Sequence, residues 1–94
     1  MEEIIKKKIK DRALHNGCSQ IRRLLQEECA EVIQAISKYE REENFENYRA
    51  IFDELADIEN LKRQLIAMST APEGYWEQHI EDTILKKLVR QENR

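Results

Sequence analysis

The chain has 94 residues, of which 37% are charged and 40% are apolar, and its formal net charge is −3. This length predicts a single domain over residues 1–94, with a core so small that association between copies would stabilise it. The interspersed charges argue against broad electrostatic binding to nucleic acid, and the short apolar runs predict no membrane span.

The chain opens with MEEIIKKKIK, which lacks the apolar segment of a secretory signal peptide, so a cytoplasmic protein is expected. Helical periodicity predicts a first helix over about residues 2–15, ended by Gly17 as a left-handed C-terminal residue. Two longer helices are predicted over about 19–41 and 45–68, separated by a turn in the polar stretch EREENFEN. The stretch STAPEG predicts a loop before a last helix over about 73–91. Long helices with short connections predict an all-α fold, an antiparallel four-helix bundle.

Acidic side chains interrupt the apolar faces of the two central helices. At about 100° per residue, Glu28 falls within the apolar face of the second predicted helix, and Glu31 falls at the edge of that face. In the third predicted helix, Glu54 falls within the apolar face and Asp57 at its margin. Each helix therefore carries two carboxylates at positions i and i+3, which are neighbours on a helix surface.

Carboxylates gathered on a buried face repel one another and lose hydration unless a cation lies between them. Oxygen ligands suit Mg²⁺, with Mn²⁺ as a possible substitute. The pattern thus predicts a metal site, although one acidic pair at the edge of an apolar face is a weak signal. The alternative interpretation is that each pair forms ordinary salt bridges at the rim of the core.

The same residues carry a resemblance to a known family. Residues 27–31 read EExxE, residues 54–57 read ExxD, and the intervening segment 32–53 has a length within the range of that family. With the flanking stretches RLLQEECAEVIQAISKY and IFDELADIENLKRQL, this double motif resembles the MazG-like branch of the all-α nucleoside triphosphate (NTP) pyrophosphatase superfamily.

The resemblance implies Mg²⁺-dependent hydrolysis of a (d)NTP to the monophosphate and pyrophosphate by a metal-activated water. Carried over by position, it implies Glu28, Glu31, Glu54 and Asp57 as the metal ligands. Glu28 and Glu27 are the implied catalytic residues, with Glu27 either holding a metal-bound water or acting as the base. The family forms dimers or tetramers, so a homodimer or tetramer is expected here.

Five further side chains are candidate substrate contacts. Gln20 resembles a Gln of phage-type relatives, as a base contact or as a cap of its helix. Trp76 follows the predicted loop, where it would stack on a base or pack at an oligomer interface. Lys62 lies near the apolar face of the third predicted helix. Lys87 and Arg90 resemble a basic pattern in the last helix of the family, although cations are also favoured near helix C-termini.

Two other functions stay open. One is a phosphoribosyl-ATP pyrophosphohydrolase-like enzyme, which uses similar acidic pairs. The other is a non-catalytic helical interaction module. An interaction module does not require carboxylates such as Glu28 and Glu54 within apolar faces. Mg²⁺ would not stabilise such a module, whereas it would stabilise either enzyme.

Overall fold

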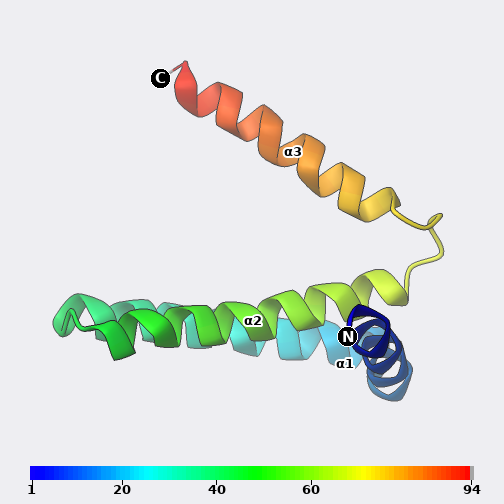
Figure 1. Cartoon of the computed structure of the whole chain (residues 1–94), viewed down its shortest axis with the longest axis horizontal. Helices are drawn as coiled ribbons and strands as arrows, with labels where there is room; N and C mark the ends of the chain where they lie inside the picture. The colour runs from blue at the N-terminus through cyan, green and yellow to red at the C-terminus, as the bar shows by residue number, and fades with distance from the viewer. Residues whose placement is uncertain (94) are drawn as a thin grey trace.

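The computed structural model describes residues 1–93 and contains only helices and connections within that range. Its helices are α1 (Glu2–Arg41), α2 (Phe45–Ala67) and α3 (Tyr75–Glu92) (Figure 1). Arg94, the last residue of the predicted domain, lies outside the described residues. None of the helices described combines the length and apolar character needed to cross a bilayer.

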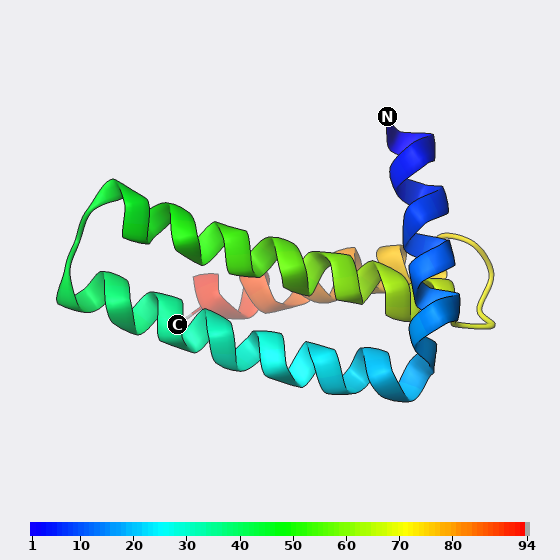
Figure 2. The same ribbon diagram turned by 90° about the horizontal axis from the view of Figure 1, so that it is seen from below.

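Helix α1 contains a break where the sequence predicts two helices. Gly17 has φ 77° and ψ 158°, so its backbone is not helical, and the chain changes direction there (Figure 2). The predicted positive φ is confirmed, but ψ is extended rather than left-handed helical, and no loop intervenes. We call residues 2–16 the N-terminal segment of α1 and residues 18–41 its long segment.

The long segment of α1 and α2 form an antiparallel hairpin (Figure 2). Asn44 caps the start of α2, because its Oδ1 accepts a hydrogen bond from the backbone N–H of Asn47 at 2.8 Å. The buried Asn47 side chain in turn donates through Nδ2 to the carbonyl oxygen of Glu42 at 2.9 Å. The turn predicted in this polar stretch is therefore confirmed, and side chains satisfy two of its backbone groups, the N–H of Asn47 and the carbonyl of Glu42.

The core is small and lies beside the bend in α1. Its buried apolar side chains are Ala13, Ile21 and Leu61, with Leu24, Leu25, Leu65 and Met68 packed against them. Next to them, Asn16 donates through Nδ2 to Oε1 of the buried Gln64 at 2.9 Å. Gln64 donates through Nε2 to Oδ1 of Asn60 at 3.1 Å. The Asn16–Gln64 bond joins α1 to α2 and favours one register between them, because a buried amide is costly without partners, and the bond to Asn60 within α2 satisfies the other end of the Gln64 amide.

Helix α3 diverges from the hairpin after the loop that the STAPEG stretch predicts (Figure 1). Among the described residues, the extensive helix–helix contact is between α1 and α2. The predicted four-helix bundle is therefore not confirmed within one chain, although the all-α class is. The physical reason is that the bend at Gly17 sends the N-terminal segment across α2 and the loop before α3 directs that helix away from the hairpin (Figure 1 and Figure 2). Large apolar side chains of α3, such as Leu85 at 62% exposure, consequently have no helix of the same chain to pack against.

Replacing Gly17 with Ala is expected to lower the free energy of unfolding by about 1–3 kcal/mol, because this φ/ψ region is accessible essentially only to glycine. A Cβ at position 17 meets no atom within 4 Å, so the cost arises from the backbone. Urea unfolding followed by circular dichroism measures it. Ser19→Ala, an exposed change in the same helix, is the control and is expected to stay within about 0.5 kcal/mol. Equal stability of the two variants would contradict the need for a positive φ.

Candidate metal centre

Carboxylates from both helices of the hairpin converge at one place. One oxygen from each of Glu28, Glu54 and Asp57 lies within 4.8 Å of the other two. The register explains this meeting: from the Asn16–Gln64 hydrogen bond, Glu28 along α1 and Glu54 back along α2 are each roughly 15–18 Å away at 1.5 Å per residue. We call Glu28, Glu54 and Asp57 the carboxylate cluster.

Glu28 is the least favourably placed member of the cluster. Its side chain is half-buried, and its Oε2 is fully buried without a hydrogen-bond partner among the described residues. Burial raises the pKa of Glu28 above its ordinary value, and the nearby carboxylates of Asp57, Glu54 and Glu31 raise it further. The folded chain alone therefore holds the proton of Glu28 more tightly than the unfolded chain does.

Basic side chains do not relieve the repulsion inside the cluster. The ion pairs found in residues 1–93 are Lys6–Glu73, Lys7–Asp11, Lys62–Glu59 and Arg63–Glu59. None of them involves a member of the carboxylate cluster, so the rim salt bridges of the alternative interpretation are not seen there. A half-buried carboxylate that has an unpartnered oxygen and lies close to two further carboxylates offers the oxygen ligands that suit a hard divalent cation such as Mg²⁺.

The two other predicted acidic residues lie outside the converging set. Glu31 is exposed, yet it is close enough for its charge to raise the pKa of Glu28. Glu27 is exposed and is not one of the three residues whose oxygens meet. Of the four predicted metal ligands, the structure thus brings three together and places Glu31 beside them.

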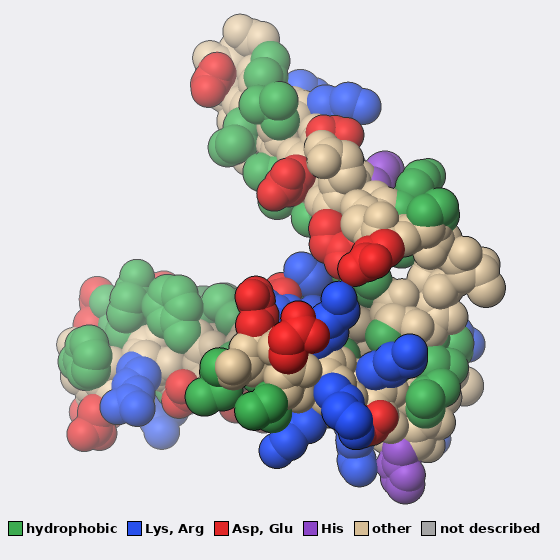
Figure 3. All heavy atoms as spheres, turned by 45° about the vertical axis from the view of Figure 1, so that its right-hand side comes forward, with side chains coloured by type: hydrophobic (Ala, Val, Ile, Leu, Met, Phe, Trp, Pro, Cys, Tyr) green, Lys and Arg blue, Asp and Glu red, His purple; other side chains and the backbone are tan. Residues whose placement is uncertain are grey.

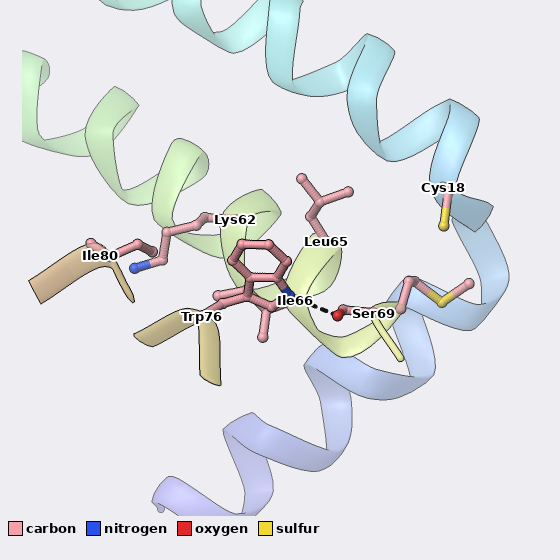
Figure 4. Close-up of a pocket in the computed structure, with 8 residues that line it drawn as sticks. Cys18, Lys62, Leu65, Ile66, Ser69, Trp76 and Ile80 are labelled. Atoms are coloured by element: carbon pink, nitrogen blue, oxygen red, sulfur yellow. Dashed lines mark hydrogen bonds between the residues drawn. The ribbon is translucent and has the colours of Figure 1, made fainter. Parts of the chain in front are cut away.

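Two of the predicted substrate contacts meet at a cavity beside the carboxyl end of α2 (Figure 4). Trp76 and Lys62 both line this cavity, which has a volume of about 400 Å³ and which we call the Trp76 cavity. The other lining residues are Cys18, Leu65, Ile66, Met68, Ser69 and Ile80. The indole Nε1 of Trp76 donates to Oγ of Ser69 at 2.7 Å, which ties the ring to the loop before α3.

The remaining predicted substrate contacts are not brought to the cluster. Gln20 is half-buried inside α1, where its Oε1 accepts a hydrogen bond from Arg23, so it does not cap a helix. Lys87 and Arg90 are exposed on α3, which diverges from the hairpin. Within one chain these two cations therefore have no contact with the carboxylates.

Sequence reasoning missed Ser69, the hydrogen-bond partner that orients Trp76. The only available signal was its position at the start of the STAPEG stretch, seven residues before the indole. The sequence also did not indicate Asn60 and Gln64. Polar residues in a helix are normally taken to face solvent, and only the structure shows that Gln64 is buried and bonded to Asn60.

Comparisons with known proteins identify no relative of this chain. No protein-family model, curated protein or solved structure matches it. The resemblance to the MazG-like branch therefore depends on the two acidic motifs and their flanking residues.

The raised pKa of Glu28 predicts a pH-dependent stability in the absence of divalent metal. Because the folded state holds this proton more tightly than the unfolded state, the stabilisation is complete below the ordinary pKa of 4.5 and is lost as pH rises through the raised value. Glu28→Gln cannot lose a proton. In EDTA, its melting temperature is expected to match that of the wild type at acid pH and to exceed it at pH 7 to 8.

Thermal unfolding between pH 4 and pH 8 measures this difference. Glu40→Gln removes one carboxylate from the same helix outside the cluster and serves as the control. A difference between Glu28→Gln and wild type that does not change with pH would contradict the prediction.

Proposed function

We propose that the protein is a Mg²⁺-dependent nucleoside triphosphate pyrophosphohydrolase of the MazG-like kind, with Mn²⁺ as a possible substitute. The observation that carries the proposal is the buried, unpartnered Oε2 of Glu28, set against the carboxylates of Glu54 and Asp57. A chain that places a carboxylate there without a basic partner is expected to gain its compensating charge from a ligand. The resemblance of the EExxE and ExxD motifs supports the same reaction.

In this proposal Glu28, Glu54 and Asp57 hold the ion, and Glu31 joins them from one turn along α1. When bound, Mg²⁺ offsets the negative charge of the phosphate oxygens and activates water for attack at phosphorus. Glu27 is exposed and precedes Glu28, and we assign it the role of accepting the proton of the attacking water. The bond between the α- and β-phosphates breaks, giving the monophosphate and pyrophosphate.

The Trp76 cavity is the proposed position of the base. Its lining is mostly apolar, and the indole, held by Ser69, offers a flat surface for stacking. Lys62 lines this cavity and follows Asp57 by roughly 7–8 Å along α2. A nucleotide whose base stacks on Trp76 would extend its phosphates past Lys62 toward the carboxylates.

The proposal includes a homodimer or tetramer acting in the cytoplasm. Large apolar side chains remain exposed on both the hairpin and α3 (Figure 3). They include Ile33 at 66% and Phe52 at 54% on the hairpin, and Leu85 at 62% on α3. Pairing two hairpins would supply the four-helix bundle that one chain lacks, and would allow Lys87 and Arg90 of one copy to approach the cluster of another.

Incubation with each of the eight common (d)NTPs in Mg²⁺ or Mn²⁺ is expected to yield monophosphate and pyrophosphate. Glu28→Gln and Glu54→Gln are each expected to lower turnover by at least about 10–100-fold, since each removes a charged ligand. Chromatographic separation of the products measures both. Asp53→Asn, next to Glu54 but outside the cluster, is the matched control and is expected to keep its activity.

Release of diphosphate and orthophosphate would contradict the cleavage position.

The exposed apolar side chains also fit the non-catalytic interaction module, and metal binding separates the two functions. For the enzyme, Mg²⁺ at ten times its Kd adds about 1.4 kcal/mol of stability, a rise of roughly 5–10 °C in Tm. Absence of both turnover and this rise in Tm would contradict the enzyme and favour the non-catalytic interaction module.

Sedimentation equilibrium at micromolar concentration is expected to give at least twice the chain mass of 11.3 kDa. The reason is that a core of three buried apolar side chains leaves much apolar surface to be covered by another copy. A charged substitution among the exposed apolar side chains of α3, Leu85→Glu, is expected to lower the mass, whereas Lys86→Glu next to it is the control. A wild-type mass of one chain would contradict the dimer.

A further inference from the structure

A second cavity, of about 550 Å³, lies between the N-terminal segment of α1 and α2. It exists because the bend at Gly17 sends the N-terminal segment across α2 instead of along it (Figure 2). Its lining residues are Ile5, Lys8, Ile9 and Arg12 from α1, and Ala56, Glu59, Asn60 and Arg63 from α2. We call it the cross-helix cavity. No residue of the two acidic motifs except Ala56, the third residue of ExxD, lines it.

The charge of the cross-helix cavity is opposite to that of the chain as a whole. Three cations and one carboxylate line it, a surplus of two positive charges in a chain of net charge −3. The carboxylate, Glu59, is already shared between Arg63 at 2.8 Å and Lys62 at 2.9 Å. Within residues 1–93, Lys8 and Arg12 take part in no ion pair or side-chain hydrogen bond. Two cations of the lining are thus available to an anion.

The polar groups of the lining are also oriented as donors. Asn60 accepts through Oδ1 from Nε2 of Gln64, whose own Oε1 accepts from Asn16. This chain of hydrogen bonds assigns the oxygen of Asn60 to the buried side and leaves its NH₂ group to donate. Arg63 uses Nε toward Glu59, so its two terminal NH₂ groups remain as donors. Ammonium, guanidinium and amide donors from two helices make a set suited to anionic oxygens.

The cross-helix cavity does not belong to a nucleotide seated against Trp76. At about 100° per residue, the centre of its α2 residues lies roughly 120° around the helix from the centre of Lys62, Leu65 and Ile66 of the Trp76 cavity, and the two linings share no residue. The two cavities therefore open on different sides of α2. An anion bound in the cross-helix cavity occupies a site of its own.

We propose that the cross-helix cavity binds an oligophosphate, either free or as the phosphate chain of a second nucleotide. A single carboxylate needs one bidentate guanidinium, whereas this lining offers two guanidinium groups, one ammonium and one amide on facing helices. Lys8 and Arg12 lie one helical turn apart, roughly 5–6 Å between their Cβ atoms, so both side chains can reach the same phosphate chain. Ile5 and Ile9 add apolar surface to the lining, beside Lys8 and Arg12 on the same segment.

Calorimetric titration of the protein with inorganic tripolyphosphate, in EDTA and at low salt, tests the site. The double variant Lys8→Gln/Arg12→Gln is expected to weaken binding at least about tenfold, because it removes two charged donors. Lys7→Gln/Lys10→Gln removes the same charge from the same segment outside the cavity, and is expected to change binding by less than about twofold. Circular dichroism verifies that both variants fold.

Equal weakening in both double variants, or no binding by the wild type, would overturn the proposal. Parallel titration with ATP in EDTA distinguishes the two sources of phosphate. Affinity for ATP above that for tripolyphosphate, lost in Lys8→Gln/Arg12→Gln, supports a nucleotide, whereas the reverse order supports a free oligophosphate. Because these titrations contain no Mg²⁺ and measure no turnover, their failure is separate from a failure of the proposed hydrolysis.

Discussion

The bend at Gly17 is the constraint on which the rest of this structure depends. A straight α1 would carry its first sixteen residues past the end of α2, whereas the break folds them back across that helix. Ala13 from before the break and Ile21 from after it then enclose Leu61, and Asn16 reaches Gln64. The core, the register of the hairpin and both cavities therefore depend on the bend at Gly17.

The carboxylate cluster shows a conflict between stability and the proposed function. A hairpin with so small a core would gain from an apolar residue at position 28, because burial of a carboxylate without a partner opposes folding. The chain instead places Glu28 against Glu54 and Asp57. Such a local violation of the rules for a stable core is expected where a ligand supplies the missing interaction, and it is the physical basis of the proposed metal site.

The sequence predicts the helices and the cluster better than it predicts their arrangement. Helical periodicity locates Glu28 and Glu54 on apolar faces because a face depends only on local geometry, and the structure brings these carboxylates together. Periodicity contains no information about the angle at Gly17 or the direction of α3, which depend on contacts between distant residues. The basic run containing Lys8 and Arg12 therefore resembles a solvated face, and its approach to Asn60 and Arg63 appears only in three dimensions.

The divergence of α3 leaves this helix without a packing partner and leaves the carboxylate cluster without the cations of α3. In one chain, the apolar side chains of α3 lack a partner helix, and Lys87 and Arg90 are remote from the carboxylates that would need cations to hold a triphosphate. Lys62, which follows Asp57 on α2, is already paired with Glu59. Association with a second copy would cover the apolar side chains of α3 and could also bring cations to the carboxylate cluster. We therefore expect assembly and substrate binding to be linked, since the same helix carries the apolar side chains for the first and the cations for the second.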